Sequence, residues 1–354
     1  MDLTSLTTAV RDADDVVAVG GRTHWEVGGT PSAHAVEVRA PSGVIVYEPA
    51  DLTVTVAAGT PVHELSAVLG EASQECALDP RSSDATVGGV LAVGLSGHRR
   101  LRYGPLRDRV LEVRFVTPDG RLVKGGGPTV KNVSGFDIPR LLVGSFGTIG
   151  VLVQVILRCQ PQPEVAEWST THDDPFEVRR RTYRPSCIAW DGERTHLLAE
   201  GVAADVERER SAAGTEPVSR SGTEPVSGAP PWPEGPHRGR VSIAPASLRE
   251  LAPALRDTGV RWLAEIGVGT IHIATDAEEG LAAARAAAEE HGGWLLREAG
   301  APDLDGFGRA LPNLALMRRI RAAFDPTGKL GRGRLQLEPE PHPPVDVEGE
   351  TSHV

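Results

Sequence analysis

The chain has 354 residues, of which 40% are hydrophobic and 24% are charged, and its formal net charge is -11. This length exceeds what one hydrophobic core usually serves, so we expect two domains. The acidic balance argues against a nucleic-acid-binding surface, because binding phosphates requires clustered Lys and Arg. Cys76, Cys159 and Cys187 lack CxxC spacing. Neither a disulfide framework nor a metal or iron-sulfur site is therefore expected.

We expect neither an export signal nor a membrane span from the sequence. Its first residues, "MDLTSLTTAVRDADD", show no basic region followed by an apolar one. No run approaches the roughly 18 apolar residues that a membrane helix needs. We expect a cytoplasmic protein whose only membrane association would come through partner subunits.

The first 160 residues predict short strands and helices divided by glycine-rich turns. Leu52, Val54 and Val56 alternate with threonines as in a half-buried strand, and Thr60 then caps a helix that starts at Pro61. The segment "LEVRFVTPDGRLV" predicts a hairpin around its PDG turn. "TIGVLVQVILRCQPQP" predicts a strand that ends at its prolines near residue 160.

The remainder predicts a second, smaller α+β unit. Residues 205–240 contain the imperfect duplication "GTEPVSRSGTEPVSG" and few large apolar residues, which predicts a flexible insert. Periodicity then predicts helices over 247–259, 280–293 and 311–324 and strands over 261–275 and 294–299. The proline-rich end predicts a disordered acidic tail. We therefore divide the chain into domains 1–160 and 161–335 and a tail 336–354.

Three glycine clusters mark the first domain. The first, "VVAVGGRTHWEVGGTP", lacks the GxGxxG spacing and the crossover helix of a Rossmann site. Its backbone N–H groups from Gly21 to His24 could instead form a nest for pyrophosphate. In the second cluster, Gly88 and Gly89 begin an apolar helical turn whose N-terminus favours anions. The nearby Arg99, Arg100 and Arg102 could neutralise a phosphate or a substrate carboxylate, although a solvated charge run is the more common explanation.

The third cluster is the stretch "KNVSGFDIPRLLVGSFGTIGVL". A glycine inside a helix or strand costs about 0.5–1 kcal/mol relative to alanine. Gly135, Gly144, Gly147 and Gly150 therefore predict a group that approaches the backbone closely. A single glycine pair is usually a tight turn, but three clusters within 150 residues indicate a shared ligand.

The order of these motifs resembles the flavin-binding domain shared by vanillyl-alcohol oxidase, p-cresol methylhydroxylase (PCMH) and the FAD-linked hydroxyacid oxidases. The resemblance covers about residues 14–160. The residues from Lys131 to Leu141 are similar to the KN-x-x-G-[YF]-D-x-x-[RK]-L motif of the FAD-binding subunits of bacterial glycolate oxidase. "FDPTGKLGRGRL" is similar to their closing segment, with Gly331, Arg332 and Gly333 in place of the usual NPG. The resemblance implies an α+β fold: a PCMH-type FAD-binding domain of two α+β subdomains, followed by a smaller α+β cap or substrate domain.

The resemblance also implies a cofactor, FAD, and the residues that hold it. The pyrophosphate would lie on Gly20, Gly21, Arg22, Thr23 and His24. The adenine and phosphate side would be lined by Thr86, Val87, Gly88, Gly89, Gly94, Ser96 and Gly97. The flavin and ribityl chain would pass Asp137, Gly144, Ser145, Phe146, Gly147, Thr148, Gly150 and Val151, where Ser145 and Thr148 could donate to flavin oxygens. His24 lies one position beyond the histidine that carries a covalent flavin in parts of the superfamily, so we expect noncovalent FAD.

By the same resemblance, the chain would oxidise a small 2-hydroxy acid by hydride transfer to FAD, together with a second flavin subunit and an iron-sulfur subunit. Catalytic subunits of these oxidases carry an HxGDGN-x-H motif, of which "IGVGTIHIA" retains only His272. His272 and Arg99 are the candidate catalytic residues, and Arg107 and Lys131 are further candidate cations near the flavin. Two alternatives stay open: a noncatalytic FAD-binding scaffold that relays electrons, and an NADPH-linked flavin reductase of the same superfamily.

Overall fold

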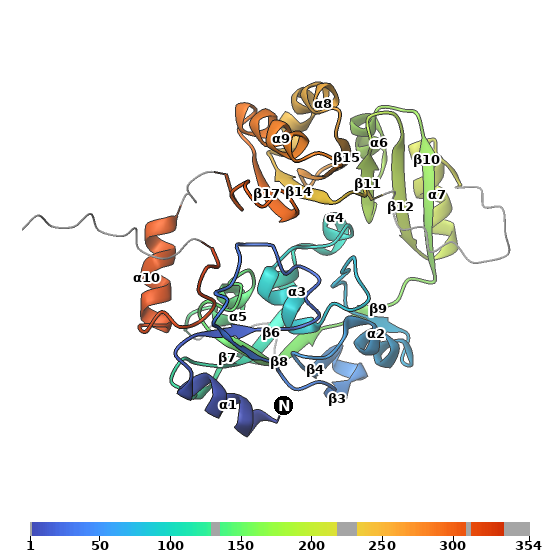
Figure 1. Ribbon diagram of the computed structural model, residues 1–354. Helices are drawn as coiled ribbons and strands as arrows, with labels where there is room; N and C mark the ends of the chain where they lie inside the picture. The colour runs from blue at the N-terminus through green and yellow to red at the C-terminus, as the bar shows by residue number, and fades with distance from the viewer. Residues whose placement is uncertain (1, 129–134, 218–231, 309–312, 336–354) are drawn as a thin grey trace, which may run out of the picture.

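The computed structural model describes residues 2–128, 135–217, 232–308 and 313–335. Two antiparallel sheets organise the chain, one in each half (Figure 1). The change from one sheet to the other falls between Arg158 and Val165. Among the described residues, no helix has the length and apolar character needed to cross a membrane.

The first sheet has five strands in the order β3-β4-β8-β6-β7. They are β3 (Val44–Glu48), β4 (Thr53–Ala57), β6 (Val110–Val116), β7 (Leu122–Gly126) and β8 (Val151–Arg158). Val54 and Val56 are fully buried, as the alternation in this segment predicts. The β6–β7 pair confirms the hairpin predicted around the PDG turn.

The smaller elements of this half surround the sheet. They are α1 (Leu3–Asp12), β1 (Val16–Ala18), β2 (Val36–Val38), α2 (Val62–Gly70), β5 (Gln74–Glu75), α3 (Val87–Val93), α4 (Arg100–Tyr103), α5 (Ile138–Leu142) and β9 (Gln160–Pro161). The capping role predicted for Thr60 is wrong, because Pro61 is the N-cap of α2 and makes no side-chain cap. Thr60 Oγ1 instead donates to the carbonyl of Ala57 at 2.7 Å and accepts from the N–H of Gly43 at 2.8 Å.

The second sheet has eight strands in the order β13-β10-β12-β11-β15-β16-β14-β17, and every neighbouring pair is antiparallel. The strands are β10 (Val165–Thr171), β11 (Cys187–Trp190), β12 (Thr195–Gly201), β13 (Glu216–Pro217), β14 (His237–Ser242), β15 (Arg261–Glu265), β16 (Thr270–Thr275) and β17 (Trp294–Ala299). Helices α6 (Pro175–Arg181), α7 (Ala203–Ala213), α8 (Leu248–Asp257) and α9 (Glu278–Glu290) pack on it. In Figure 1, α8 and α9 lie on the side of this sheet away from the first domain, and α4 lies near the opposite side.

Two segments of the second half differ from their sequence predictions. The single strand predicted over 261–275 is a hairpin of β15 and β16, because Gly267 and Gly269 take φ of +83° and +81° and reverse the chain. The insert predicted over 205–240 begins within α7 and ends within β14, and its residues 218–231 lie outside the described part.

The end of the described chain returns to the first domain. After α10 (Leu314–Phe324), Leu330 pairs in parallel with Val16 of β1. The N–H of Gly331 donates to the carbonyl of Val16 at 2.8 Å, and the N–H of Leu335 donates to the carbonyl of Gly28 at 2.7 Å. Residues 325–335, predicted as part of the second domain, therefore support the first glycine loop. The tail predicted over 336–354 lies outside the described residues.

Candidate functional site

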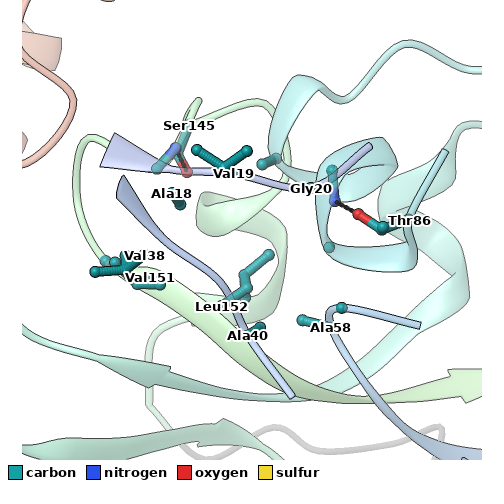
Figure 2. A pocket seen from close by; sticks show the side chains of 16 residues that line it. Ala18, Val19, Gly20, Val38, Ala40, Ala58, Thr86, Ser145, Val151 and Leu152 are labelled. Atoms are coloured by element: carbon teal, nitrogen blue, oxygen red, sulfur yellow. Dashed lines mark hydrogen bonds between the residues drawn. The ribbon is translucent and has the colours of Figure 1, made fainter. Parts of the chain in front are cut away.

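The three glycine clusters meet at two adjoining pockets, and Figure 2 shows the one that reaches Ser145 and Val151. Both pockets are lined by residues of all three clusters, namely Ala18, Gly20, Thr86, Gly89, Ala92 and Gly147. One pocket extends to Gly88, Ser145, Gly150 and Val151, and the other to Gly21, Arg22, Thr23, His24, Phe146 and Arg334. The fold thus brings together most of the residues expected to hold the cofactor. They come from segments more than 50 residues apart in the chain.

The loop after β1 offers unused backbone donors. Within the described residues, the N–H groups from Gly20 to His24 donate no hydrogen bond to the protein. Arg22 has φ of +57°, a left-handed conformation that occurs in anion-binding backbone nests. A Cβ on Gly21 would lie 1.7 Å from the carbonyl oxygen of Asp84, so this loop can approach its neighbour only with glycine. The geometry fits a pyrophosphate group.

The N-terminus of α3 does not provide the anion site expected from its glycines. The N–H of Val87 donates to Thr60 O at 2.9 Å and that of Gly88 to Ala58 O at 2.7 Å. The N–H of Gly89 donates to the hydroxyl of Thr86, the N-cap residue, at 3.2 Å. Because these N–H groups already donate to the protein, the N-terminus of α3 has no free donors for an anion, and α3 only forms part of the pocket wall.

The glycines of the third cluster serve different purposes. A Cβ on Gly150 would lie 2.4 Å from the ring of Phe115, so Gly150 is required by packing in the core. Gly147 has φ of +74°, and the nearest atom to its Cβ position would be the Cβ of Ala18 at 3.7 Å. Gly147 and Ala18 line both pockets, so the space above Gly147 is open to a ligand.

Several residues expected at the cofactor lie outside these two pockets. They are Val87, Gly94, Ser96, Gly97, Asp137, Gly144 and Thr148. Asp137 is exposed and caps α5 by accepting from the N–H of Arg140. The hydroxyl of Thr148 donates to the carbonyl of Ser145 at 2.7 Å, so it is already used inside the loop. Gly94 lets α3 pack against Gly144, since its Cβ would lie 2.8 Å from the Cα of Gly144. Lys131 lies outside the described residues.

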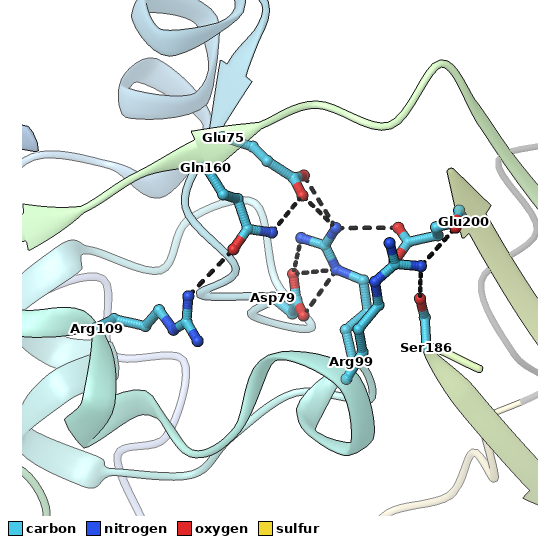
Figure 3. A network of polar contacts seen from close by, with 8 residues as sticks. Glu75, Asp79, Arg99, Arg109, Gln160, Ser186 and Glu200 are labelled. Carbon is cyan, nitrogen blue, oxygen red and sulfur yellow. Dashed lines mark hydrogen bonds and ion pairs between the residues drawn. The ribbon is translucent and has the colours of Figure 1, made fainter. Parts of the chain in front are cut away.

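Arg99 lies in a separate acidic cluster between the two domains (Figure 3). Its guanidinium contacts Asp79 at 2.7 Å, Glu75 at 2.9 Å and Glu200 at 3.1 Å. Glu200 belongs to β12 of the second domain, so Arg99 joins the domains. With its nitrogens engaged by three carboxylates and no place in the pockets, Arg99 is arranged for structure and not for contact with a substrate.

His272 is buried on β16, with 1% of its surface exposed. Its Nε2 contacts Glu265 Oε1 at 2.7 Å and its Nδ1 contacts a guanidinium nitrogen of Arg81 at 2.5 Å. Burial, and then the charges of Arg240 and Arg81, hold the pKa of His272 well below its usual range. Both ring nitrogens are used by the protein, so His272 lacks the free nitrogen that a general base needs.

A third pocket lies between the domains and adjoins the second one at His24. It is lined by His24, Asp79, Pro80, Arg81, Val90, Val93, Leu95, Ser96, Gly97, Trp232 and Arg240. Ser96 and Gly97, expected beside the adenine, are therefore at this pocket. Burial lowers the pKa of His24, the charge of Glu298 opposes that shift, and those of Arg240 and Arg81 add to it. His24 is thus an uncharged imidazole at neutral pH.

The comparisons with known proteins bear on the first domain. Residues 3–126 match the family described as FAD binding domain. This part of the chain is similar to FAD-binding domains. Its match covers β1, the loop from Gly20 to His24 and all of α3. The loop and α3 residues that line the two glycine pockets lie within the matched range.

Curated relatives include two subunits of glycolate oxidase and a D-lactate dehydrogenase. The chain is 34% identical over 236 residues to glycolate oxidase subunit GlcE of Escherichia coli K12, an alignment that covers 61% of this chain and 65% of that subunit. It is 45% identical over 83 residues to D-lactate dehydrogenase of Archaeoglobus fulgidus, covering 23% of this chain and 19% of that enzyme. It is 39% identical over 87 residues to glycolate oxidase subunit GlcD of Bacillus subtilis, covering 24% and 18%. The chain thus spans just under two thirds of the first relative and about a fifth of the other two.

A solved structure shares the fold. Alkyldihydroxyacetonephosphate synthase matches with a TM-score of 0.66 at 15% sequence identity, over 93% of this chain and 74% of that one. This match confirms the predicted α+β fold.

Sequence reasoning missed three arginines at the pockets. Arg334 lines the second pocket and donates to the carbonyls of Val27 and Gly29, at 2.5 and 2.6 Å. Arg334 could have been found from the sequence, because it belongs to the closing "GRGRL" segment. Arg81 and Arg240 line the third pocket. Arg240 could have been noticed because it alternates with buried Val241 in "HRGRVS", whereas Arg81 carries no local signal.

Proposed function

We propose that this chain is the FAD-binding subunit of an oxidoreductase that oxidises a small 2-hydroxy acid. The complex would include a second flavin subunit and an iron-sulfur subunit. The observation that carries the proposal is the pair of glycine pockets with free N–H groups from Gly20 to His24, in a segment that matches FAD-binding domains. The relatives named for glycolate and D-lactate support the substrate class.

In this proposal, separate residues of the chain would bind FAD and accept the substrate proton. Backbone N–H groups from Gly20 to His24 would bind the pyrophosphate, and Gly147 and Ser145 would leave room for the flavin beside Ala18. When bound, FAD would supply the two-electron acceptor. His24, uncharged at neutral pH and at the boundary between the cofactor and interdomain pockets, would accept the proton of the substrate hydroxyl.

A noncatalytic FAD-binding scaffold is the second candidate. It is favoured because both residues predicted to be catalytic already bind protein groups: Arg99 contacts three carboxylates, and both ring nitrogens of His272 have protein partners. The scaffold would bind FAD identically, so flavin binding does not separate the two candidates. Reduction of the flavin by the substrate does.

The cofactor assignment predicts that Gly147→Val abolishes FAD binding. The valine side chain would fill the space beside Ala18 that both glycine pockets share. The measurement is the flavin absorbance per chain of the purified protein. Wild-type protein should purify with FAD that denaturation releases, and the Gly147→Val protein should purify colourless.

Gly292→Val provides the matched control. Gly292 has φ of +77°, close to that of Gly147, and its Cβ would meet nothing within 4 Å, on an exposed turn after α9. Valine costs a similar backbone strain at both positions, roughly 1–2 kcal/mol. The control should therefore lose similar stability and keep its FAD. A folded Gly147→Val protein that remains yellow would show that the flavin lies elsewhere.

A further inference from the structure

The face of the eight-stranded sheet toward the first domain carries a row of ionisable side chains. Register pairs Arg240 of β14 directly with His272 of β16. Glu265 pairs with Thr270, two residues before His272, and Arg240 pairs with Leu296, two residues before Glu298. Since side chains alternate along a strand, Glu265, His272, Arg240 and Glu298 share one face of the sheet. The interdomain pocket opens against this row.

Arg81 reaches this row from the first domain. Its guanidinium lies 4.3 Å from the ring centre of Trp232, and its Nη1 lies 3.8 Å from Glu298 Oε2. A quarter of its side chain stays exposed. Arg81 therefore lines the pocket from a fixed position and keeps surface for a ligand.

The Glu265–His272 pair fixes Arg81. A guanidinium has donors only, so the 2.5 Å contact requires His272 Nδ1 to be the acceptor. The ring proton then resides on Nε2, which donates to Glu265 Oε1 at 2.7 Å. Hydrogen-bond donation therefore runs in one direction, from the Arg81 guanidinium through His272 to the Glu265 carboxylate.

Arg240 supplies a second cation at the same pocket. Its Nε donates to Glu298 Oε1 at 3.0 Å and its Nη1 to the carbonyl of Ser96 at 3.1 Å. Within the described residues its Nη2 donates to no protein group. Arg81 and Arg240 share Glu298 as their carboxylate neighbour, and Asp79 on the opposite wall is paired with Arg99. Arg81 and Arg240 line the pocket whereas Glu298 does not, so the two guanidinium groups are the nearer charges for an incoming carboxylate on this wall.

We propose that Arg81 and Arg240 form the carboxylate receptor for the 2-hydroxy acid, and that Glu265 and His272 are positioning residues that hold Arg81 in place. This inference rests on the proposed function, because it assigns a site to that substrate. Guanidinium groups bind carboxylates in a planar, bidentate geometry. Trp232, Leu95 and Val93 bound the pocket and limit it to small acids. His24 lies where this pocket meets the cofactor pocket, which directs the substrate hydroxyl toward it.

The test is the binding of oxalate, a small dicarboxylate that lacks a C–H bond to oxidise, measured by calorimetry on the purified chain. Arg81→Met should weaken binding roughly 10- to 100-fold, as expected for the loss of a charged hydrogen-bond donor. Arg81→Lys should fall between Arg81→Met and wild type. The matched control is Arg261→Met, which removes an exposed arginine paired with Asp276 on the same sheet and should leave oxalate affinity unchanged.

His272 gives a readout that a merely structural role would not produce. His272→Asn places an amide acceptor near the position of Nδ1 and should retain most of the affinity. His272→Leu fills the same space without an acceptor and should lose about as much affinity as Arg81→Met. If the residue served only packing, leucine would be the better substitute, so the reverse order would overturn its positioning role.

Flavin content separates this inference from the proposed function. An Arg81→Met chain that keeps wild-type affinity for oxalate overturns the receptor. If instead this variant loses FAD while flavin-free wild-type protein binds no oxalate, the arginines serve the pyrophosphate and the receptor is also overturned. A wild-type chain that binds oxalate through Arg81 but never FAD supports the anion site and contradicts the proposed function.

Discussion

Glu265 carries a carboxyl group whose pKa is raised by burial on the sheet face that meets the first domain. It is 3% exposed, and its Oε1 accepts from His272. Burial raises its pKa to about 7, although the charges of Arg240, Arg100 and Arg81 pull in the opposite direction. The protonated form is therefore favoured in the folded chain over a pH range in which an unfolded chain is ionised.

This shift predicts a pH-dependent difference between wild type and Glu265→Gln. The folded pKa of about 7 lies above the ordinary value of 4.5, so between these values the folded state binds more protons than the unfolded state. Wild-type stability should accordingly fall relative to the variant by about 3 kcal/mol as pH rises from 4.5 to 7, at about 1.4 kcal/mol per pKa unit. Denaturant unfolding of both proteins across this range measures the difference. Parallel pH profiles would contradict it.

Individual residues also show where sequence reasoning ends. The segment from Gly21 to His24 was predicted as an N–H nest from the sequence pattern, and its N–H groups donate to no protein group within the described residues. The same reasoning failed at Gly88 and Gly89. Their N–H groups are used by Ala58 and by the Thr86 hydroxyl, and no local pattern reveals that Ala58 lies there.

At the scale of elements, local patterns predicted the strands and helices well where apolar residues alternate. The hairpin of β6 and β7 and helices α8, α9 and α10 formed near their predicted positions. The β15–β16 hairpin was missed because residues on both sides of its turn are apolar, which conceals the break at Gly267 and Gly269. Helix α7 was missed because few of its residues are buried, so it carries little apolar periodicity.

The Arg99 cluster makes a prediction about how elements are joined. Arg99, at the start of α4, holds Glu75, Asp79 and Glu200 in an environment where their side chains are 18%, 11% and 3% exposed. Arg99→Met would leave these carboxylates without their shared cation. The free energy of unfolding should drop by about 3–5 kcal/mol, as for other broken buried ion pairs.

Guanidinium-induced unfolding measures this change, and Arg121→Met is its control. Arg121 pairs with Asp119 at 2.6 Å, but its side chain is 74% exposed. Such surface pairs contribute little, so this variant should unfold like wild type. Equal unfolding of the two variants would show that the interdomain cluster does not hold the domains together.

At the scale of the whole molecule, the arrangement of the domains is what the sequence did not reveal. The resemblance of residues 14–160 to FAD-linked oxidases predicted the first domain and its cofactor. The interdomain pocket depends on Arg81 from one domain meeting Arg240 and Trp232 from the other, more than 140 residues away along the chain. Such a contact follows from tertiary packing and has no local pattern.

Anaerobic mixing of the purified FAD-containing chain with glycolate or D-lactate tests the central claim most directly. We expect the visible absorption band of the flavin to be bleached, in the isolated chain or after the partner subunits are added, because a hydride from the substrate reduces it. A flavin that stays oxidised with every small 2-hydroxy acid, in the isolated chain and in its complex, would contradict the account and favour the noncatalytic scaffold.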